Sequence, residues 1–138
     1  MFCLLIITFL LIELVEGVDW LFYRKKSINC NITNYSTTHI DIQVIDEIKG
    51  KWRLTGFYGM QEGRKRKESW NLLRRLSQMS SLPWCIMGDF NDILSMDEKK
   101  GRSEWPNWLI QGFRQAVMDT GLIDLSMLGY SFTWFKSF

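Results

Sequence analysis

The chain has 138 residues, of which 46% are hydrophobic and seven are tryptophan, and its formal net charge is +2 at pH 7. This length suits one small domain with a hydrophobic core, and the composition excludes a disordered chain. The charge is too small either to demand or to exclude a nucleic-acid partner. The cysteines, Cys3, Cys30 and Cys85, have no spacing typical of a metal site or a redox motif.

Residues 1–16 contain an apolar run, Phe2 to Ile12, that is too short for a transmembrane helix, so we expect no stable membrane span. The run has the length of a signal-peptide core with cleavage near Gly17, but the basic amino-terminal charge of a signal is missing. We favour a buried strand or frame-shifted sequence here, and a nuclear or cytoplasmic protein. Secretion stays open, because Asn31-Ile32-Thr33 and Asn34-Tyr35-Ser36 are glycosylation triplets.

Residues 18–46 combine an apolar stretch, a polar connection and an alternating pattern. Residues 18–28 contain the apolar run Trp20 to Tyr23 and then a basic triplet, and the Asn-, Thr- and Ser-rich residues 29–38 predict a turn-rich connection. Alternation over 39–46 predicts a half-buried strand, with His39, the single histidine, in a structural role. Polar residues 47–51 predict a hairpin turn, and 52–58 an antiparallel strand ending at Tyr58.

Two helices are predicted around the middle of the chain. Residues 64–80 place Trp70, Leu73, Leu76 and Met79 at roughly helical spacing, with Leu72 widening the stripe. Pro106 suits the first position of a second helix, and Gly121 suits its carboxyl-terminal cap. The basic residues of the first helix would steer DNA phosphates or simply form its solvated surface, and both interpretations stay open. These basic residues are Arg64, Lys65, Arg66 and Lys67.

Between the helices, Trp84 to Asn91 reads Trp-Cys-Ile-Met-Gly-Asp-Phe-Asn. A short apolar run closed by a turn signal predicts a strand buried on both faces. Gly88 permits a bend or a close backbone approach. In an extended segment, Asp89 and Asn91 would project to the same side and Phe90 to the other. A solvated polar loop is expected from Asp92 to Arg102, followed after residue 130 by a last strand.

Gly88-Asp89-Phe90-Asn91 resembles the Gly-Asp-Phe-Asn signature of the endonuclease/exonuclease/phosphatase superfamily, which comprises Mg²⁺-dependent phosphodiesterases. Further blocks are similar to plant non-LTR retrotransposon endonucleases, and four blocks in the right order are more specific than one short motif. The other blocks are 52–59, 66–70, 82–84 and 132–134.

The resemblance covers about residues 17–138, so residues 1–16 are expected to be an apolar segment outside a partial endonuclease/exonuclease/phosphatase domain. It implies an α/β fold: a partial four-layered α/β sandwich, with two packed mixed or antiparallel sheets, outer helices, and the first and last strands of the family lacking. Because the family's catalytic histidine lies near the end of its domain, His39 does not inherit that role.

For the chemistry, the resemblance implies that Asp89 orients or activates water, that Asn91 holds the phosphate near a Mg²⁺ ion, and that Tyr58 contacts the phosphate. Tyr58 as a boundary aromatic with a wet hydroxyl is the alternative. Magnesium prefers oxygen ligands, so Mg²⁺ is the implied cofactor and DNA the implied partner, with no small-molecule cofactor. The oligomeric state is left open.

The family's main metal carboxylate and its closing Asp-His pair have no counterpart in the sequence. We therefore expect a fragment of a Mg²⁺-dependent DNA endonuclease of retrotransposon origin with little or no activity. The alternatives are a noncatalytic nucleic-acid-binding remnant and a small secreted glycoprotein.

Overall fold

The computed structural model describes residues 5–7, 10–15, 19–24, 28–99, 101 and 103–124, the side chains from residue 28 onward. Its described residues fall into two compact units, one within Met1–Gly59 and Ser81–Phe90 and the other within Met60–Ser80 and Asn91–Phe138. The strands are β1 (Leu5–Ile7), β2 (Leu10–Val15), β3 (Asp19–Arg24), β4 (Asn29–Tyr35), β5 (His39–Asp46), β6 (Gly50–Tyr58) and β7 (Trp84–Asp89). The helices are α1 (Arg66–Gln78) and α2 (Asn107–Thr120), with 3-10 turns η1 (Gly63–Lys65) and η2 (Met96–Glu98).

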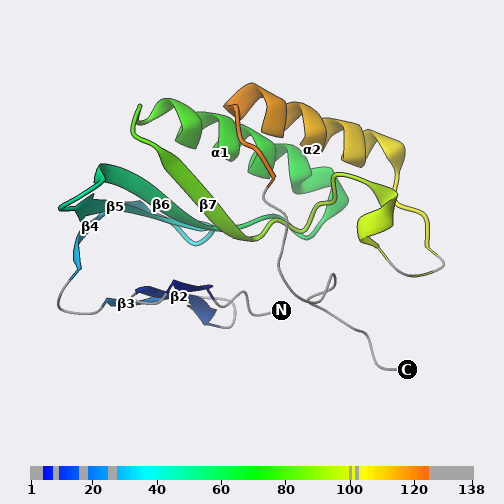
Figure 1. The fold of residues 1–138 in the computed structure, drawn as a ribbon. Coiled ribbons are helices and arrows are strands. Elements are labelled where there is room, and N and C mark those ends of the chain that lie inside the picture. Colours follow the sequence, from blue (N-terminus) through cyan, green and yellow to red (C-terminus); the bar gives the residue numbers. More distant parts are fainter. Residues whose placement is uncertain are drawn as a thin grey trace. The chain divides into compact units, whose positions relative to one another are not determined.

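The fold is mixed α/β, with a four-stranded mixed sheet in the order β4-β5-β6-β7 (Figure 1). The pairs β4–β5 and β5–β6 are antiparallel, whereas β6 and β7 are parallel. Parallel neighbours need a long crossover connection, and the one between β6 and β7 contains α1. The backbones of β1, β2 and β3 form an antiparallel meander, in which β3 contains the apolar run Trp20 to Tyr23.

The β5–β6 hairpin forms as predicted because local signals determine its turn. Asp46 Oδ1 accepts hydrogen bonds from the backbone N–H groups of Ile48 and Lys49, both at 2.8 Å. An Asp that caps its own turn in this way offers the backbone a partner where the ladder ends. The register places Asp46 opposite Gly50.

The connection predicted over 29–38 is wrong, because residues Asn29–Tyr35 form β4. Pairing with β5 satisfies their backbone groups, and one register shift lies between Ile32 and Asn34. Cys30 is the one buried residue of β4, since its side chain joins the apolar face of the sheet. Asn and Thr therefore reflect the exposure of this strand, and local composition could not reveal its tertiary pairing.

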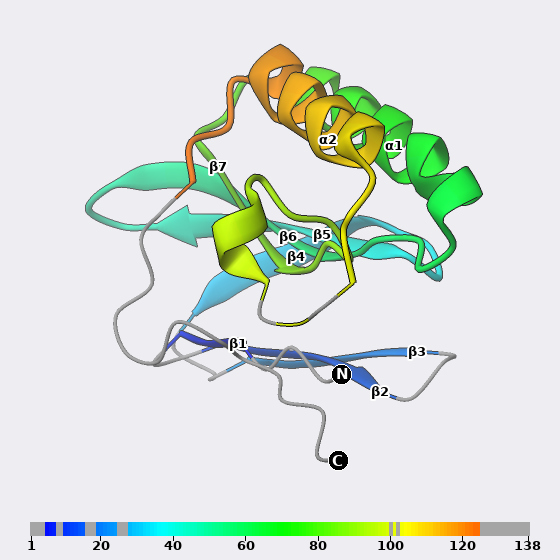
Figure 2. The same cartoon turned by 90° about the vertical axis from the view of Figure 1, so that its right-hand side faces the viewer.

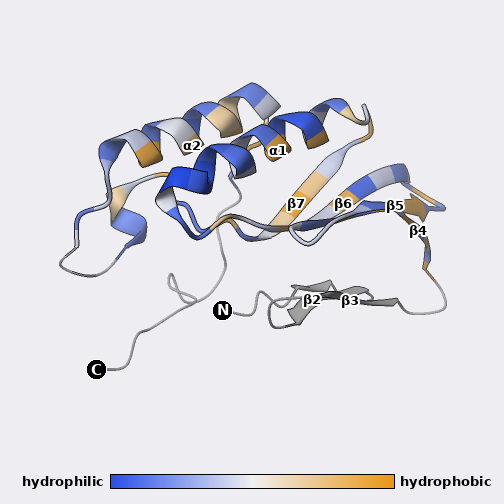
Figure 3. Ribbon diagram, turned by 180° about the vertical axis from the view of Figure 1, so that it is seen from behind, coloured by the Kyte–Doolittle hydropathy of each residue, from blue (hydrophilic) through white to orange (hydrophobic). Residues whose placement is uncertain are grey.

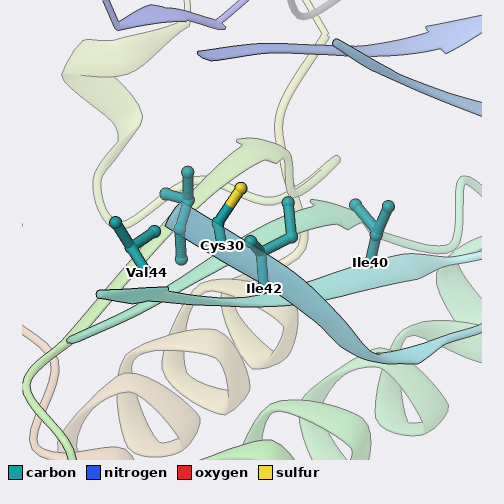
Figure 4. Close-up of a cluster of buried hydrophobic side chains, with 5 residues drawn as sticks. Cys30, Ile40, Ile42 and Val44 are labelled. Atoms are coloured by element: carbon teal, nitrogen blue, oxygen red, sulfur yellow. The ribbon is translucent and has the colours of Figure 1, made fainter. Parts of the chain in front are cut away.

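One face of the four-stranded sheet carries an apolar cluster of Cys30, Ile40, Ile42, Val44 and Leu54. Their relative exposures are 5% or less, and Figure 4 shows the labelled side chains projecting from the same side of the strands. Residues two apart in a strand share a face, which explains the alternation predicted for β5. Burying an aliphatic side chain of this size contributes about 1.5–3 kcal/mol.

The opposite face is also buried, which corrects the prediction that β5 is only half-buried. Asp41 is 3% exposed and accepts hydrogen bonds from Arg53 Nε at 2.7 and 2.8 Å. Thr55 donates its hydroxyl to Asp41 Oδ1 at 2.7 Å, and Trp84 Nε1 donates to Thr55 Oγ1 at 2.8 Å. The Arg53 guanidinium carbon lies 4.8 Å from the centroid of the Trp84 ring. We call these four residues the sheet polar network.

The strand predicted over the Trp84 run is confirmed as β7, but its expected burial on both faces is wrong. Residues Trp84 to Gly88 are half-buried, and only Asp89 is buried. The reason is topological: within the described part of the chain, β7 is hydrogen-bonded to β6 alone and ends the strand order. Cys85 and Met87 nevertheless pack against the apolar cluster, and burial raises the pKa of the Cys85 thiol.

In the second unit, α1 and α2 lie side by side (Figures 1 and 2). The predicted stripe of α1 is confirmed for Trp70, Leu73 and Leu76, all buried. It is wrong for Met79, which follows the last helical residue and is 53% exposed. From α2, Leu109, Ile110, Phe113 and Ala116 are buried, and both helices are mixed blue and orange in Figure 3, as amphipathic helices should be. The Trp70 and Trp108 rings meet edge to face at 6.2 Å, and Arg74 pairs with Asp119 at 2.8 Å.

The ends of α2 lie within one residue of the prediction. Pro106, predicted at the first helical position, instead occupies the N-cap with ψ 130°, and Gly121 adopts the left-handed conformation at the carboxyl end with φ 71°. The turn and strand predicted after residue 125 lie outside the described residues. Among the helices that the structure describes, none is long and apolar enough to span a membrane.

Candidate functional site

The candidate site begins where β6 and β7 end. Because these strands are parallel, their carboxyl ends meet at one edge of the sheet, and the register pairs Tyr58 with Asp89. The Gly59 backbone N–H donates to the Asp89 carbonyl at 2.7 Å, which extends the pairing past the strand ends. Sequence reasoning thus selected two residues, 31 positions apart, that the fold makes neighbours.

The sequence neighbours of Tyr58 and Asp89 also contact each other. The rings of Phe57 and Phe90 lie 5.1 Å apart, tilted by 31°. Gly88 has φ +145°, and a Cβ on it would lie 1.9 Å from the Phe57 carbonyl oxygen, so only glycine lets β7 pass this close to β6. Asp89 is 9% exposed, whereas Tyr58 is half-buried.

Asn91 departs from the expected extended geometry. The strand ends at Asp89, and Asn91 has φ +53°, in the left-handed region that Asn tolerates better than most residues. The prediction that Asp89 and Asn91 share one side of an extended segment is therefore wrong. Asn91 also belongs to the second compact unit, in which other residues determine its surroundings.

Arg66 contacts Asn91 in that unit, although the sequence had left this arginine as either a cation that steers DNA or part of a solvated helix surface. Arg66 Nη1 donates to the Asn91 carbonyl oxygen and, at 2.8 Å, to Asp92 Oδ1. Its Nη2 and Nε donate to the Gln61 carbonyl at 2.8 and 3.3 Å. Because its side chain is only 5% exposed, Arg66 is not available to meet DNA phosphates.

Asp92 corrects a second expectation, since the residue predicted to open a solvated loop has a side chain only 1% exposed. Its Oδ2 accepts a hydrogen bond from Trp70 Nε1 at 2.9 Å. Burial raises the pKa of the Asp92 carboxyl, and the hydrogen bonds from Trp70 and Arg66 oppose this rise. We call Arg66, Asp92 and Trp70 the loop clamp, because Arg66 joins the segment after β6 to the segment after β7.

Trp105 packs against the loop clamp. The Arg66 guanidinium carbon and Lys99 Nζ each lie 4.8 Å from a Trp105 ring centroid. A cation over an aromatic face adds about 0.5–2 kcal/mol, more when water is excluded. Three features of the sequence could have indicated the clamp. They are a Trp at position 70 within the apolar stripe of the helix, an Arg four residues before it, and an Asp directly after the Gly-Asp-Phe-Asn motif.

The other basic residues of this region are exposed. Arg64, Lys65 and Lys67 lie at the surface, and the first two pair with Glu62 at 3.4 and 3.1 Å. The hydrogen bond from Lys65 is the main reason why the pKa of Glu62 is lowered. Exposed pairs like these contribute little stability, and salt screens them.

The described residues contain no group of three or more His, Cys, Asp and Glu side chains placed to hold a metal ion. His39 is 5% exposed, and its Nδ1 lies 2.7 Å from Ser36 Oγ. The register pairs His39 with Phe57, so it lies beside the carboxyl end of β6. No protein-family model matches the chain, and neither a curated protein nor a solved structure matches it.

Proposed function

We propose that this chain is part of a Mg²⁺-dependent phosphodiesterase of the endonuclease/exonuclease/phosphatase type, derived from a retrotransposon endonuclease and with impaired activity. The observation that carries the proposal is the parallel pairing of β6 with β7, which sets Tyr58 and Asp89 side by side at the carboxyl edge of a sheet. Open α/β sheets bind their ligands at such edges. The Gly-Asp-Phe-Asn motif supplies the chemistry at that edge.

Each of the three residues would have a different task. Asp89 would orient a water molecule towards the phosphorus, because a carboxylate accepts a hydrogen bond from the attacking water. Tyr58 would donate its hydroxyl to a phosphate oxygen, and the Asn91 carboxamide would hold another. The negative charge that develops on the phosphate would be neutralised by a bound Mg²⁺.

The residues fit a magnesium ion only in part. Asp89 and Asn91 offer the oxygen ligands that Mg²⁺ prefers, and Mg²⁺ often uses one or two carboxylates together with phosphate oxygens. Among the residues that the structure describes, however, no group of three or more His, Cys, Asp and Glu side chains is placed to hold a metal ion. This is why the proposal includes impaired activity.

In the same proposal, the four-stranded sheet would be one layer of the family's four-layered sandwich. Its apolar cluster would form the interface with a second sheet, since stacked sheets bury the inner face of each strand. The exposed polar residues of β4 would then lie at the rim.

Nicking of supercoiled plasmid tests the reaction. The purified chain is expected to nick slowly and only with Mg²⁺, and Asp89→Ala should reduce the rate about 10²–10⁴-fold, as expected for loss of a general base. Asp97→Ala is the matched control, because it removes an exposed carboxylate from η2. Nicking that survives chelation of Mg²⁺, or that Asp89→Ala leaves unchanged, would overturn the proposal.

DNA binding provides a separate prediction. Arg64→Gln with Lys67→Gln removes two exposed cations and should weaken binding of duplex DNA. The slope of log K against log salt should become shallower by about 1–2, because each phosphate contact contributes about 0.9. The matched control is Lys49→Gln with Lys51→Gln, two exposed lysines of the β5–β6 hairpin. Equal losses of DNA affinity in the two double variants would show that Arg64 and Lys67 bind DNA no better than other exposed cations.

A further inference from the structure

We infer that Arg66 is a positioning residue of this site: it holds Asn91 in its left-handed conformation by joining the segment after β6 to the segment after β7. The catalytic part of this inference rests on the proposed function, whereas the structural part does not. It assigns Arg66 a role other than phosphate binding and adds Asp92 and Trp70, which the motif does not include.

The first step of the argument concerns the backbone. A non-glycine residue at positive φ costs about 1–2 kcal/mol relative to an ordinary conformation, less for Asn. Such a residue persists only where its surroundings determine it, and the Asn91 carbonyl accepts a hydrogen bond from Arg66 Nη1. Arg66 thus acts on the peptide group that Asn91 contributes to the turn.

The second step concerns the shape of the guanidinium group. One edge of Arg66, Nε with Nη2, reaches the Gln61 carbonyl, and Nη1 reaches Asn91 and Asp92. A planar fork of five donors can join two backbone segments, whereas the ammonium group of lysine is a single point of charge. Lysine is therefore the conservative variant that keeps the charge and loses the bridge.

The third step explains why Arg66 itself stays fixed. Asp92 compensates its charge in a setting where the two side chains are 5% and 1% exposed. Trp70 Nε1 donates a hydrogen bond to the other oxygen of the Asp92 carboxylate, and the Trp105 ring packs against the Arg66 guanidinium. Arg66, Asp92 and Trp70 come from the first turns of α1 and from the segment after β7, so the rigid helix orients the clamp.

The test compares wild type with Arg66→Lys, using Arg74→Lys as the matched control. Arg74 makes the same type of ion pair, with Asp119, at the partly exposed outer side of α1 and α2. Hydrogen exchange is followed in the backbone amides of residues 60–63 and 91–94. Arg66→Lys should speed exchange in both segments together, while Arg74→Lys changes neither, and unaltered exchange in Arg66→Lys would overturn the inference whatever the activity.

Nicking then separates positioning from general stability. Arg66→Lys should lower the Mg²⁺-dependent rate about 10–100-fold, the effect of misplacing a catalytic group. Asn91→Gly removes the carboxamide while keeping positive φ accessible, so the double variant should nick within about twofold of Asn91→Gly alone. Additive losses would mean that Arg66 acts elsewhere, and would leave the proposed function intact.

Two further outcomes have distinct meanings. If wild type shows no nicking that depends on Asp89, the proposed function fails, and the exchange experiment alone decides whether Arg66 joins the two segments. If Arg66→Lys does not fold, Asp92→Asn replaces it, since that variant keeps the shape of the side chain and removes the charge partner. Faster exchange in both segments of Asp92→Asn supports the inference, and unchanged exchange overturns it.

Discussion

Replacing Asp41 by alanine is expected to lower the free energy of unfolding by about 3–5 kcal/mol, the cost of breaking a buried ion pair from one side. The Arg53 side chain is 3% exposed, and its Nε donates to both oxygens of the Asp41 carboxylate. Without that carboxylate, a buried guanidinium loses its charge partner, and the Thr55 hydroxyl loses its acceptor. Since small domains have a total stability of about 5–15 kcal/mol, this one change could remove the cooperative unfolding transition.

Urea unfolding followed by tryptophan fluorescence measures the effect. The matched control is Asp119→Ala, which breaks the Arg74–Asp119 pair whose side chains are 32% and 40% exposed, and should change the unfolding midpoint very little. The double variant Asp41→Leu, Arg53→Met replaces the buried pair by apolar groups of similar size and should recover much of the loss. Equal midpoints for Asp41→Ala and Asp119→Ala would contradict the view that the sheet polar network is a buried, coupled unit.

Replacing Gly88 by alanine should also lower the free energy of unfolding strongly, and Gly101 provides a closely matched control. Gly88 and Gly101 have φ +145° and +146°, so alanine is strained at both positions, by about 1–3 kcal/mol. They differ in their neighbours: a Cβ at Gly88 would lie 1.9 Å from the Phe57 carbonyl oxygen, whereas one at Gly101 meets nothing within 4 Å. The clash should add about 1–3 kcal/mol at Gly88 alone.

This clash cannot be relieved by a rotamer change, because the atom in the way belongs to the β6 backbone. Relief requires β6 and β7 to separate at the point where they place Tyr58 beside Asp89. Gly88→Ala should therefore lower both the unfolding midpoint and the nicking rate, while Gly101→Ala lowers the midpoint alone. The same loss of stability in the two variants would show that strand separation at Gly88 costs nothing.

These predictions depend on contacts that the sequence did not reveal. The sheet polar network joins residues 12 to 29 positions apart, and the loop clamp joins Arg66 to Asp92 across 26 positions. Asp41 looked like the solvated side of a half-buried strand, and Arg66 like one of four equivalent surface cations. A charged side chain is buried only where a partner from a distant segment compensates its charge, and periodicity within one strand or helix contains no information on that partner.

The residues of the proposed site show the same difference between what the sequence indicates and what tertiary structure decides. The residues that bear the candidate chemistry, Asp89, Asn91 and Tyr58, were selected through the resemblance of the sequence to the endonuclease/exonuclease/phosphatase motifs. That Tyr58 and Asp89 are register partners depends on the parallel pairing of β6 with β7. That Asn91 leaves the extended conformation depends on the turn that Arg66 contacts.

By itself, the sequence determined the elements whose cause is local: the β5–β6 hairpin with its Asp46 turn, the amphipathic stripe of α1, and α2 between Pro106 and Gly121. Short-range hydrogen bonds, dihedral preferences and the spacing of apolar residues suffice for these. Only the tertiary structure decided that residues 29–35 form a strand, that β7 is half-buried, and that Asp41 and Asp92 lie inside. The physical reason is that strand pairing and charge compensation are satisfied between segments, so they exist only once the chain has folded.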